Sequence, residues 1–204
     1  SLPPVSPHTA RVPSVALHPN GKVFIGGAFT TVNGTYRYGI VRLNANGSLD
    51  GSFDFTNTES LGRVSSIALQ SDGKIIIGSE SFPSQIARLN ADGSLDSSFN
   101  PGTGPTAGVT SVGLQPDGKV LVSGVRLNVD GSLDHTYVPV PPTNNPNFNP
   151  DISVPGTDAS LAECSAVQAD GKVLIGGYTS TFYYDPEGGY YAFWRYFLYR
   201  FNAD

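Results

Sequence analysis

A phrase rich in side-chain oxygens recurs along the chain, with residue types that could bind calcium. It reads LNANGSLD from Leu43, LNADGSLD from Leu89 and LNVDGSLD from Leu127. Calcium takes roughly six to eight oxygen ligands, typically from a D-x-[DN]-x-[DN]-G loop that ends in a Glu. The phrases lack that Glu and that spacing, so we interpret them as turns in which Asn and Asp side chains bind nearby backbone groups. The residues concerned are Asn44, Asp50, Asn90, Asp92, Asp96, Asn128, Asp130 and Asp134.

No other group of residues has the spacing of a catalytic or cofactor site. His8, His18 and His135 stand in unrelated contexts, without a metal-binding motif among them. The sequence has no G-x-S-x-G elbow, no P-loop and no dinucleotide fingerprint. It therefore predicts a protein that is not an enzyme, with no catalytic residue, no bound metal and no cofactor.

An aromatic cluster is the most individual feature of the chain. Residues 179–202 read TSTFYYDPEGGYYAFWRYFLYRFN. Tyr and Trp combine apolar area with a polar group, which favours them at protein interfaces and on sugar-binding faces. We expect half of these side chains to fill a core and the other half to contact a partner. The candidates for partner contact are Tyr183, Tyr191, Trp194 and Tyr196.

Composition narrows the classes of partner. The net charge is -5 and only 12 residues are Lys or Arg, so a nucleic-acid partner is not expected. No apolar run reaches the roughly 18 residues of a membrane helix, so membrane insertion is not expected either. The single cysteine, Cys164, rules out an internal disulfide framework, and we expect it to be a small buried residue in a strand.

The elements that carry these residues repeat. The first phrase of each repeat reads SVALHPNGKVFIGG from Ser14, SIALQSDGKIIIGS from Ser66, SVGLQPDGKVLVSG from Ser111 and SAVQADGKVLIGG from Ser165. The glycine before the lysine recurs after 52, 45 and 53 residues. Alternating apolar residues around Asn-Gly or Asp-Gly predict a tight hairpin in which both turn residues adopt positive φ. The LNxDGSLD phrase predicts a second hairpin, hence about four short antiparallel strands in each repeat. Such a period is typical of a β-propeller blade, and a β-helix is the less fitting alternative.

We therefore expect an all-β fold, a β-propeller of about four blades. Residues 1–204 would form a single domain with repeats at about 12–58, 64–108, 109–150 and 158–204. The third repeat has only Val125 between Gly124 and Arg126, so its middle hairpin is expected to be missing. The fourth repeat should carry a long aromatic hairpin around residues 185–189, and the proline-rich residues 138–156 should form a surface loop.

The repeat phrases resemble the bacterial delta-60 repeats. That family's pattern runs approximately S-I-A-L-Q-P-D-G-K-I-L-I-G-G followed by R-L-N-x-D-G-S-L-D-x-S-F, and residues 64–99 reproduce it almost letter for letter. The resemblance implies a β-propeller in secreted or surface proteins, and the family has no general catalytic activity.

The two ends of the sequence supply parts of one phrase, since it ends in FNAD and begins with SL. Residues 1–11 could complete the last blade and close the ring, which would remove exposed strand edges. They could instead pair with the C-terminal edge of a neighbouring copy, which would build a filament. A third explanation is that the chain is an excised part of a longer array. The residues involved in closure or assembly would be Ser1, Leu2, Asn202 and Asp204.

These observations predict a non-catalytic extracellular or cell-surface scaffold that contacts protein or carbohydrate. One alternative is a subunit or sheath component of an extracellular filament, built by head-to-tail strand pairing. The other is a propeller hydrolase or lyase with its site at the mouth of the central channel.

Overall fold

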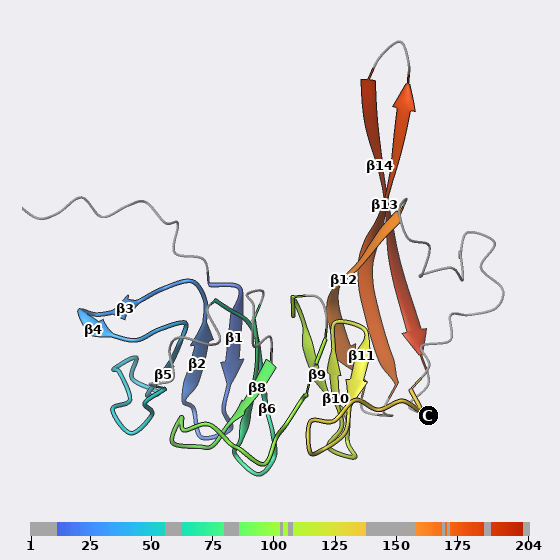
Figure 1. Ribbon diagram of the computed structural model, residues 1–204. Coiled ribbons are helices and arrows are strands. Elements are labelled where there is room, and N and C mark those ends of the chain that lie inside the picture. The colour runs from blue at the N-terminus through green and yellow to red at the C-terminus, as the bar shows by residue number, and fades with distance from the viewer. Residues whose placement is uncertain are drawn as a thin grey trace, which may run out of the picture. The chain divides into compact units, whose positions relative to one another are not determined.

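The computed structural model describes residues 12–55, 63–79, 86–102, 104–105, 108–137, 158–168, 170, 172–185 and 189–201. Across these ranges the secondary structure is β throughout, as predicted (Figure 1). Within them there is accordingly no apolar helix of membrane-spanning length. The chain divides into two compact units, residues 1–98 with 107–109 and residues 99–106 with 110–204.

The first compact unit contains the first two repeats, each of which forms a three-stranded antiparallel sheet. Sheet 1 has the order β1-β2-β5 and sheet 2 the order β6-β7-β8. A small hairpin of two strands, β3 and β4, lies between β2 and β5 in the sequence. The strands are β1 (Ser14–Leu17), β2 (Val23–Gly26), β3 (Thr31–Val32), β4 (Thr35–Tyr36), β5 (Ile40–Leu43), β6 (Val64–Leu69), β7 (Ile75–Ser79) and β8 (Ile86–Leu89).

The second compact unit contains the last two repeats, again as one three-stranded sheet each. Sheet 3 has the order β9-β10-β11 and sheet 4 the order β12-β13-β14. The strands of sheet 4 are much longer than those of the other sheets. The bounds are β9 (Val112–Leu114), β10 (Val120–Val122), β11 (Val125–Leu127), β12 (Asp158–Val167), β13 (Val173–Asp185) and β14 (Gly189–Phe201).

In each of the first three repeats, the predicted fourth strand is reduced to a single bridge. Leu43 bridges Leu49, and the same bridge recurs at Leu89–Leu95 and Leu127–Leu133. The strand stops there because the next residue starts a turn: the N–H of Phe53 donates to the carbonyl of Asp50 (3.3 Å). Each of the first three repeats is therefore three strands and a one-residue bridge, rather than four strands.

The repeated Asn-Gly and Asp-Gly turns form hairpins, but only their glycines have positive φ. In repeat 2 the N–H of Gly73 donates to the carbonyl of Gln70, and the N–H of Gln70 donates to that of Lys74. Gly73 has a φ of 86°, and the Asp72 side chain accepts a hydrogen bond from the N–H of Lys74 (3.0 Å). This is a type I turn closed by a glycine bulge. The acidic residue therefore acts in the turn as a hydrogen-bond acceptor. The prediction that it would adopt positive φ is wrong.

Turns with positive φ at both central residues occur elsewhere. They are Asn33-Gly34 (49° and 77°) and Ser123-Gly124 (43° and 93°). The second joins β10 directly to β11, with Val122 paired to Val125. This two-residue connection confirms that the third repeat lacks a middle hairpin.

The core of the first compact unit lies between sheets 1 and 2. Phe24, Ile40 and Val64 are buried together there, and the Phe24 and Phe53 rings meet edge to face at 5.3 Å. The two sheets approach closely at Gly26, where a Cβ atom would lie 2.7 Å from a methyl group of Val64. Only glycine fits this contact without displacing a neighbour.

The second compact unit repeats the same packing between sheets 3 and 4. Leu121 of sheet 3 is buried against Val173 and Ile175 of sheet 4. The hydroxyl of Ser111 accepts a hydrogen bond from the N–H of Ser165 (2.8 Å). Its counterpart in the first unit is the hydroxyl of Ser14, which accepts from the N–H of Ile67 (3.0 Å). One packing rule thus operates in both units.

The prediction of a buried Cys164 is wrong. The residue lies on β12 as expected, but it is exposed, beside a register shift between Ala162 and Cys164. Its thiol is 3.6 Å from the carbonyl of Gly176. The reason is the pleat: Ser165 contacts sheet 3, so Cys164, its neighbour in the strand, points to the opposite face.

Several predicted features lie outside the described residues. These are the proline-rich loop at 138–156 and the terminal residues Ser1, Leu2, Asn202 and Asp204. Ring closure by the N-terminal segment and strand pairing between copies therefore stay predictions.

We expect the glycine turns of repeats 1 and 2 to differ in their tolerance of alanine. Gly47 and Gly93 are equivalent and have φ of 81° and 94°, but a Cβ at Gly93 would lie 2.9 Å from the backbone of Asp54, whereas at Gly47 it would meet nothing within 4 Å. Gly47→Ala should lower the free energy of unfolding by about 1 kcal/mol through backbone strain alone. Gly93→Ala should lower it by about 3 kcal/mol because the backbones also clash. Urea titration measures both, and equal costs would contradict the close contact.

Candidate functional site

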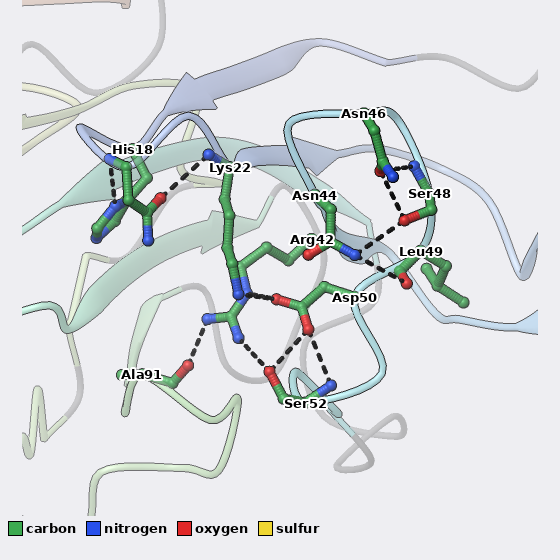
Figure 2. A network of polar contacts seen from close by, with 11 residues as sticks. His18, Lys22, Arg42, Asn44, Asn46, Ser48, Leu49, Asp50, Ser52 and Ala91 are labelled. Carbon is green, nitrogen blue, oxygen red and sulfur yellow. Dashed lines mark hydrogen bonds and ion pairs between the residues drawn. The ribbon is translucent and has the colours of Figure 1, made fainter.

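The recurring charged side chains form one cluster in each of the first three repeats. In repeat 1, the Oδ2 atom of Asp50 accepts hydrogen bonds from the Nζ of Lys22 (2.6 Å) and the Nε of Arg42 (2.7 Å), as Figure 2 shows. The corresponding distances are 2.7 and 2.7 Å in repeat 2 and 2.9 and 2.8 Å in repeat 3. We name this the Lys–Asp–Arg cluster. Its members are Lys22, Arg42 and Asp50; Lys74, Arg88 and Asp96; and Lys119, Arg126 and Asp134.

Each member comes from a different part of the repeat. In repeat 1, Lys22 follows the positive-φ glycine of the first turn, immediately before β2. Arg42 lies on β5 and pairs in register with Phe24 of β2. Asp50 follows the bridging leucine, and its N–H donates to the carbonyl of Arg42 (2.9 Å). The cluster thus joins two neighbouring strands to the segment that follows the third strand.

The second carboxylate oxygen is also engaged. The Oδ1 atom of Asp50 accepts from both the backbone N–H (3.0 Å) and the hydroxyl (2.7 Å) of Ser52. Ser98 and Thr136 play the same part in the next two repeats. Each of these carboxylates therefore receives four hydrogen bonds from its own repeat, which leaves little capacity for a cation or a substrate.

The preceding turn uses its side-chain oxygen in the same way. The Oδ1 atom of Asn46 accepts from the N–H (3.0 Å) and the hydroxyl (2.7 Å) of Ser48 (Figure 2). Asp92 and Asp130 repeat this pattern with Ser94 and Ser132. The predicted turn chemistry of the acidic phrase is confirmed at these positions.

The pKa values of the three buried carboxyls all lie well below the ordinary value. For Asp50, burial by itself would raise the pKa, but the hydrogen bonds from Lys22, Ser52 and Arg42 together outweigh it. For Asp96 the largest cause of the lowered pKa is the hydrogen bond from Lys74, and for Asp134 it is the bond from the Thr136 hydroxyl. These groups stay ionised at neutral pH, so they are poorly suited to act as general acids or bases.

The arginine of repeat 1 also links the two sheets of the first compact unit. Its Nη1 atom donates to the carbonyl of Ala91 in repeat 2 (2.6 Å), and Nη2 donates to the hydroxyl of Ser52 (3.0 Å). The guanidinium carbon lies 5.0 Å from the centre of the Phe53 ring, within the range of a cation–π contact. Arg42 therefore holds the charged cluster against the core and the next sheet, and Figure 2 shows its bond to Ala91 of that sheet.

The fourth repeat departs from this pattern within its described residues. Lys172 pairs with Asp170 of its own turn (2.7 Å), and that pair lies at the surface. Arg200, which occupies the position of Arg42, is exposed. The charged cluster is thus a feature of the first three repeats.

The aromatic residues predicted to bind a partner lie on the long hairpin of sheet 4. β13 and β14 pair without interruption from Val173–Phe201 to Asp185–Gly189, which confirms the predicted hairpin. Tyr183 lies opposite Tyr191, and Trp194 lies opposite Ser180. Tyr196 is 81% exposed and meets the ring of Tyr178 across the strands at 6.2 Å.

The end of this hairpin extends beyond the third strand of its sheet. The last pair between β12 and β13 is Asp158–Thr181. Residues 182–185 therefore pair only with 189–192 among the described strands, and the two-stranded extension is visible in Figure 1. Tyr183 and Tyr191 lie on this extension, while Trp194 and Tyr196 lie on the three-stranded part.

The described histidines have no shared site. The Nδ1 atom of His18 accepts a hydrogen bond from the N–H of Asn20 (3.2 Å) within the first turn. His135 lies next to the charged cluster of repeat 3 in the sequence, and His8 is outside the described ranges. In the part of the chain that the structure describes, no three His, Cys, Asp or Glu side chains gather as metal ligands would.

Sequence reasoning missed the Lys–Asp–Arg cluster. The signal was present, since a Lys after the first glycine and an Arg before Leu-Asn occur at the same place in the first three repeats. Neither residue type was assigned a role from the sequence. Only the sheet register brings them to one carboxylate.

The cluster predicts an acid-sensitive contribution to stability. The lowered pKa of Asp96 means that its stabilising effect is present above the ordinary value of 3.8 and is lost as the pH falls toward the folded-state pKa. Asp96→Asn should lower the free energy of unfolding by about 2 to 3 kcal/mol at pH 7. The difference from wild type should narrow as the pH falls below about 4, because the Asp96 carboxylate of the unfolded chain then takes up a proton while that of the folded chain, with its lowered pKa, is still ionised.

The matched control for this measurement is Asp72→Asn. Among the described residues, the Asp72 side chain accepts the N–H of Lys74 alone, and asparagine stands at the equivalent position, Asn20, in repeat 1. This variant should unfold at nearly the wild-type urea concentration. A pH-independent difference between wild type and Asp96→Asn would contradict the role of the ionised carboxylate.

The comparisons with known proteins agree with a propeller-type repeat. Residues 18–53 and 70–99 match a family model described as "Domain of unknown function (DUF5122) beta-propeller". Among solved structures, the chain is similar to a catalytically inactive variant of virginiamycin B lyase from Staphylococcus aureus with quinupristin, with a TM-score of 0.53 and 15% identity. The alignment covers 93% of this chain and 57% of that chain, and at such an identity it concerns the fold alone. No curated protein matches the sequence. The matched residues of the first two repeats therefore support a β-propeller-type repeat family.

Proposed function

We propose that the protein is a non-catalytic β-propeller scaffold, extracellular or at the cell surface, that presents an aromatic hairpin to a carbohydrate or protein partner. Each of the four sheets would be one blade. The packing of sheet 1 on sheet 2 and of sheet 3 on sheet 4 supports this architecture, because it follows one rule in both compact units. The surface location rests on the resemblance to the delta-60 repeats.

A scaffold role is favoured by how the charged residues are used. The buried aspartates of the first three repeats each accept hydrogen bonds from a lysine and an arginine, and two more from the Ser or Thr two residues on. An enzyme of the hydrolase or lyase class needs an acid, a base or a metal site with free capacity toward a substrate. In the described part of the chain, these recurring carboxylates instead make their hydrogen bonds within the repeat.

The observation that carries the binding role is the two-stranded extension of sheet 4. A two-stranded ribbon buries little of its own surface, and a two-stranded hairpin alone is marginally stable in water. Yet residues 182–184 and 190–191 of this ribbon are all Phe or Tyr. Tyr side chains supply contact area at low entropic cost and a hydroxyl for hydrogen bonds, which suits them to binding sugars or polar protein surfaces.

The test is a glycan array probed with the purified chain and with the double variant Tyr183→Ser/Tyr191→Ser. We expect wild type to bind a defined set of glycans and the double variant to lose about tenfold or more in affinity, as for aromatic anchors at interfaces. Tyr36→Ser is the matched control, because Tyr36 is an exposed tyrosine on the other two-stranded hairpin, β3–β4.

A second arm separates the two classes of partner. Binding to isolated cell envelopes should fall after periodate oxidation if the partner is a glycan, and after protease treatment if it is a protein. Equal binding by wild type and the double variant in both arms would refute the proposed role of the hairpin. Turnover of a bound glycan would favour the enzyme alternative.

A further inference from the structure

The two faces of each sheet have distinct roles in the packing. The leading face packs on the preceding sheet, and in sheet 2 it carries Ile67 and Ile77. The trailing face packs on the following sheet, and in sheet 1 it carries Phe24 and Ile40. Residues directly opposite each other in an antiparallel pair share a face. Because the strands pair in the same register in each repeat, equivalent residues lie on the same face of each sheet.

The rule is observed twice, once in each compact unit. The trailing face of sheet 1 packs on the leading face of sheet 2, and the hydroxyl of Ser14 accepts from the N–H of Ile67. The trailing face of sheet 3, through Leu121, packs on the leading face of sheet 4, and the hydroxyl of Ser111 accepts from the N–H of Ser165. The contact is thus a property of the repeat, not of one pair of sheets.

The leading face of sheet 1 carries exposed apolar residues on β1. Val15 is 63% exposed and Leu17 is 72% exposed, whereas Ile67, the equivalent of Val15 in sheet 2, is 8% exposed. The same side of the repeat is open at Gly47, where a Cβ would meet nothing, although the equivalent Gly93 lies against Asp54.

The trailing face of sheet 4 is also apolar and exposed. Leu198 pairs with Gly176 as Ile40 pairs with Gly26, so the two are equivalent. Leu198 is 71% exposed, whereas Ile40, packed against sheet 2, is 1% exposed. Cys164 and Ala166 of the same face are exposed as well. Isolated apolar residues at a surface are common, but Leu198 occupies a position that is buried in repeats 1 and 2.

We infer that a second copy of this chain docks head to tail, with the trailing face of its sheet 4 on the leading face of sheet 1. The trailing face of sheet 4 resembles the trailing faces of sheets 1 and 3, and the leading face of sheet 1 resembles the leading faces of sheets 2 and 4. The new contact would therefore repeat the two sheet contacts seen within the chain. Leu198 of one copy would take the place of Ile40, and Val15 of the next copy would take the place of Ile67. The contact removes both apolar surfaces from water, which drives association.

The polar groups of the two faces fit the same arrangement. Cys164 occupies the position of Ser14 and Ser111, so its sulfur would face the N–H of Val15, as a weaker acceptor than a hydroxyl. Arg200 occupies the position of Arg42, whose Nη1 donates to the carbonyl of Ala91. The equivalent of Ala91 in sheet 1 is Ala45, which is exposed. Such a contact is heterologous, so it closes a ring of copies or builds an open chain of them.

The alternative to this contact is a ring closed within one chain, with sheet 4 on sheet 1, which would bury both faces and leave the protein a monomer. The docking of a second copy does not use the proposed binding role of the hairpin. It uses the three-stranded part of sheet 4 and the first strand of sheet 1, whereas the proposed binding role uses the ribbon beyond β12. The variants of the two tests therefore share no residue.

The experiment measures mass by size exclusion with light scattering over a wide series of concentrations. Wild type should exceed the mass of one chain, 21.5 kDa, increasingly as its concentration rises. Leu17→Lys spoils the leading face of sheet 1 and Leu198→Lys spoils the trailing face of sheet 4, since either lysine would bury a charge. Each variant alone should stay a monomer. Leu95→Lys is the control, because Leu95 is an exposed leucine outside both faces, and it should behave as wild type.

Mixing the two variants decides the geometry. Leu198→Lys keeps an intact leading face and Leu17→Lys keeps an intact trailing face, so an equimolar mixture should give a dimer of one copy each and nothing larger. A like-with-like contact would instead leave one of the single variants able to associate by itself. That result, or a mixture that stays monomeric, would overturn the proposal.

A second readout covers the case in which a lysine variant fails to fold. Cys164 is the chain's single cysteine and lies on the trailing face, so its rate of maleimide labelling in wild type reports whether that face is covered. We expect the rate to fall severalfold as the chain concentration rises. A wild-type protein that stays monomeric and labels at a constant rate would reject head-to-tail docking.

Discussion

The buried carboxylate that ends the LNANGSLD, LNADGSLD and LNVDGSLD phrases is the interaction on which each of the first three repeats depends. It gathers a lysine, an arginine and the following hydroxyl residue around two oxygen atoms. A charge taken out of water needs such partners, because an unpaired one would cost several kcal/mol. The same residue follows the bridging leucine, and in repeat 1 its backbone carbonyl starts the turn that ends the sheet.

The sheets then stack by a rule that each repeat carries in its two faces. Glycine at the closest approach and apolar residues around it let neighbouring sheets come together, and a serine hydroxyl satisfies a strand N–H across the gap. A repeat of this kind cannot bury both of its faces alone. The exposed apolar positions of sheets 1 and 4 follow from that constraint, and they motivate the head-to-tail contact. The same stacking is compatible with the propeller-type match of the first two repeats.

Sequence reasoning recovered the repeat, the hairpins and the shortened third repeat because these follow from local chemistry. Glycine at a position of positive φ and β-branched residues in strands act over a few neighbouring residues. It failed where the outcome depends on distant partners. The convergence of Lys74 and Arg88 on Asp96 was missed because the three residues come from different segments of the repeat, and Cys164 is exposed because its neighbour Ser165 faces sheet 3.

The sequence by itself thus determined the all-β class, the places of the turns and the long aromatic hairpin, since each is encoded within a single phrase. The tertiary structure alone decided that Lys74 and Arg88 meet on one carboxylate, and that Leu198 is exposed where Ile40 is buried. The physical reason is that burial and ion pairing depend on which sheet lies opposite. Two residues in equivalent positions of a repeat have the same local preferences, yet only the packing of the sheets tells them apart.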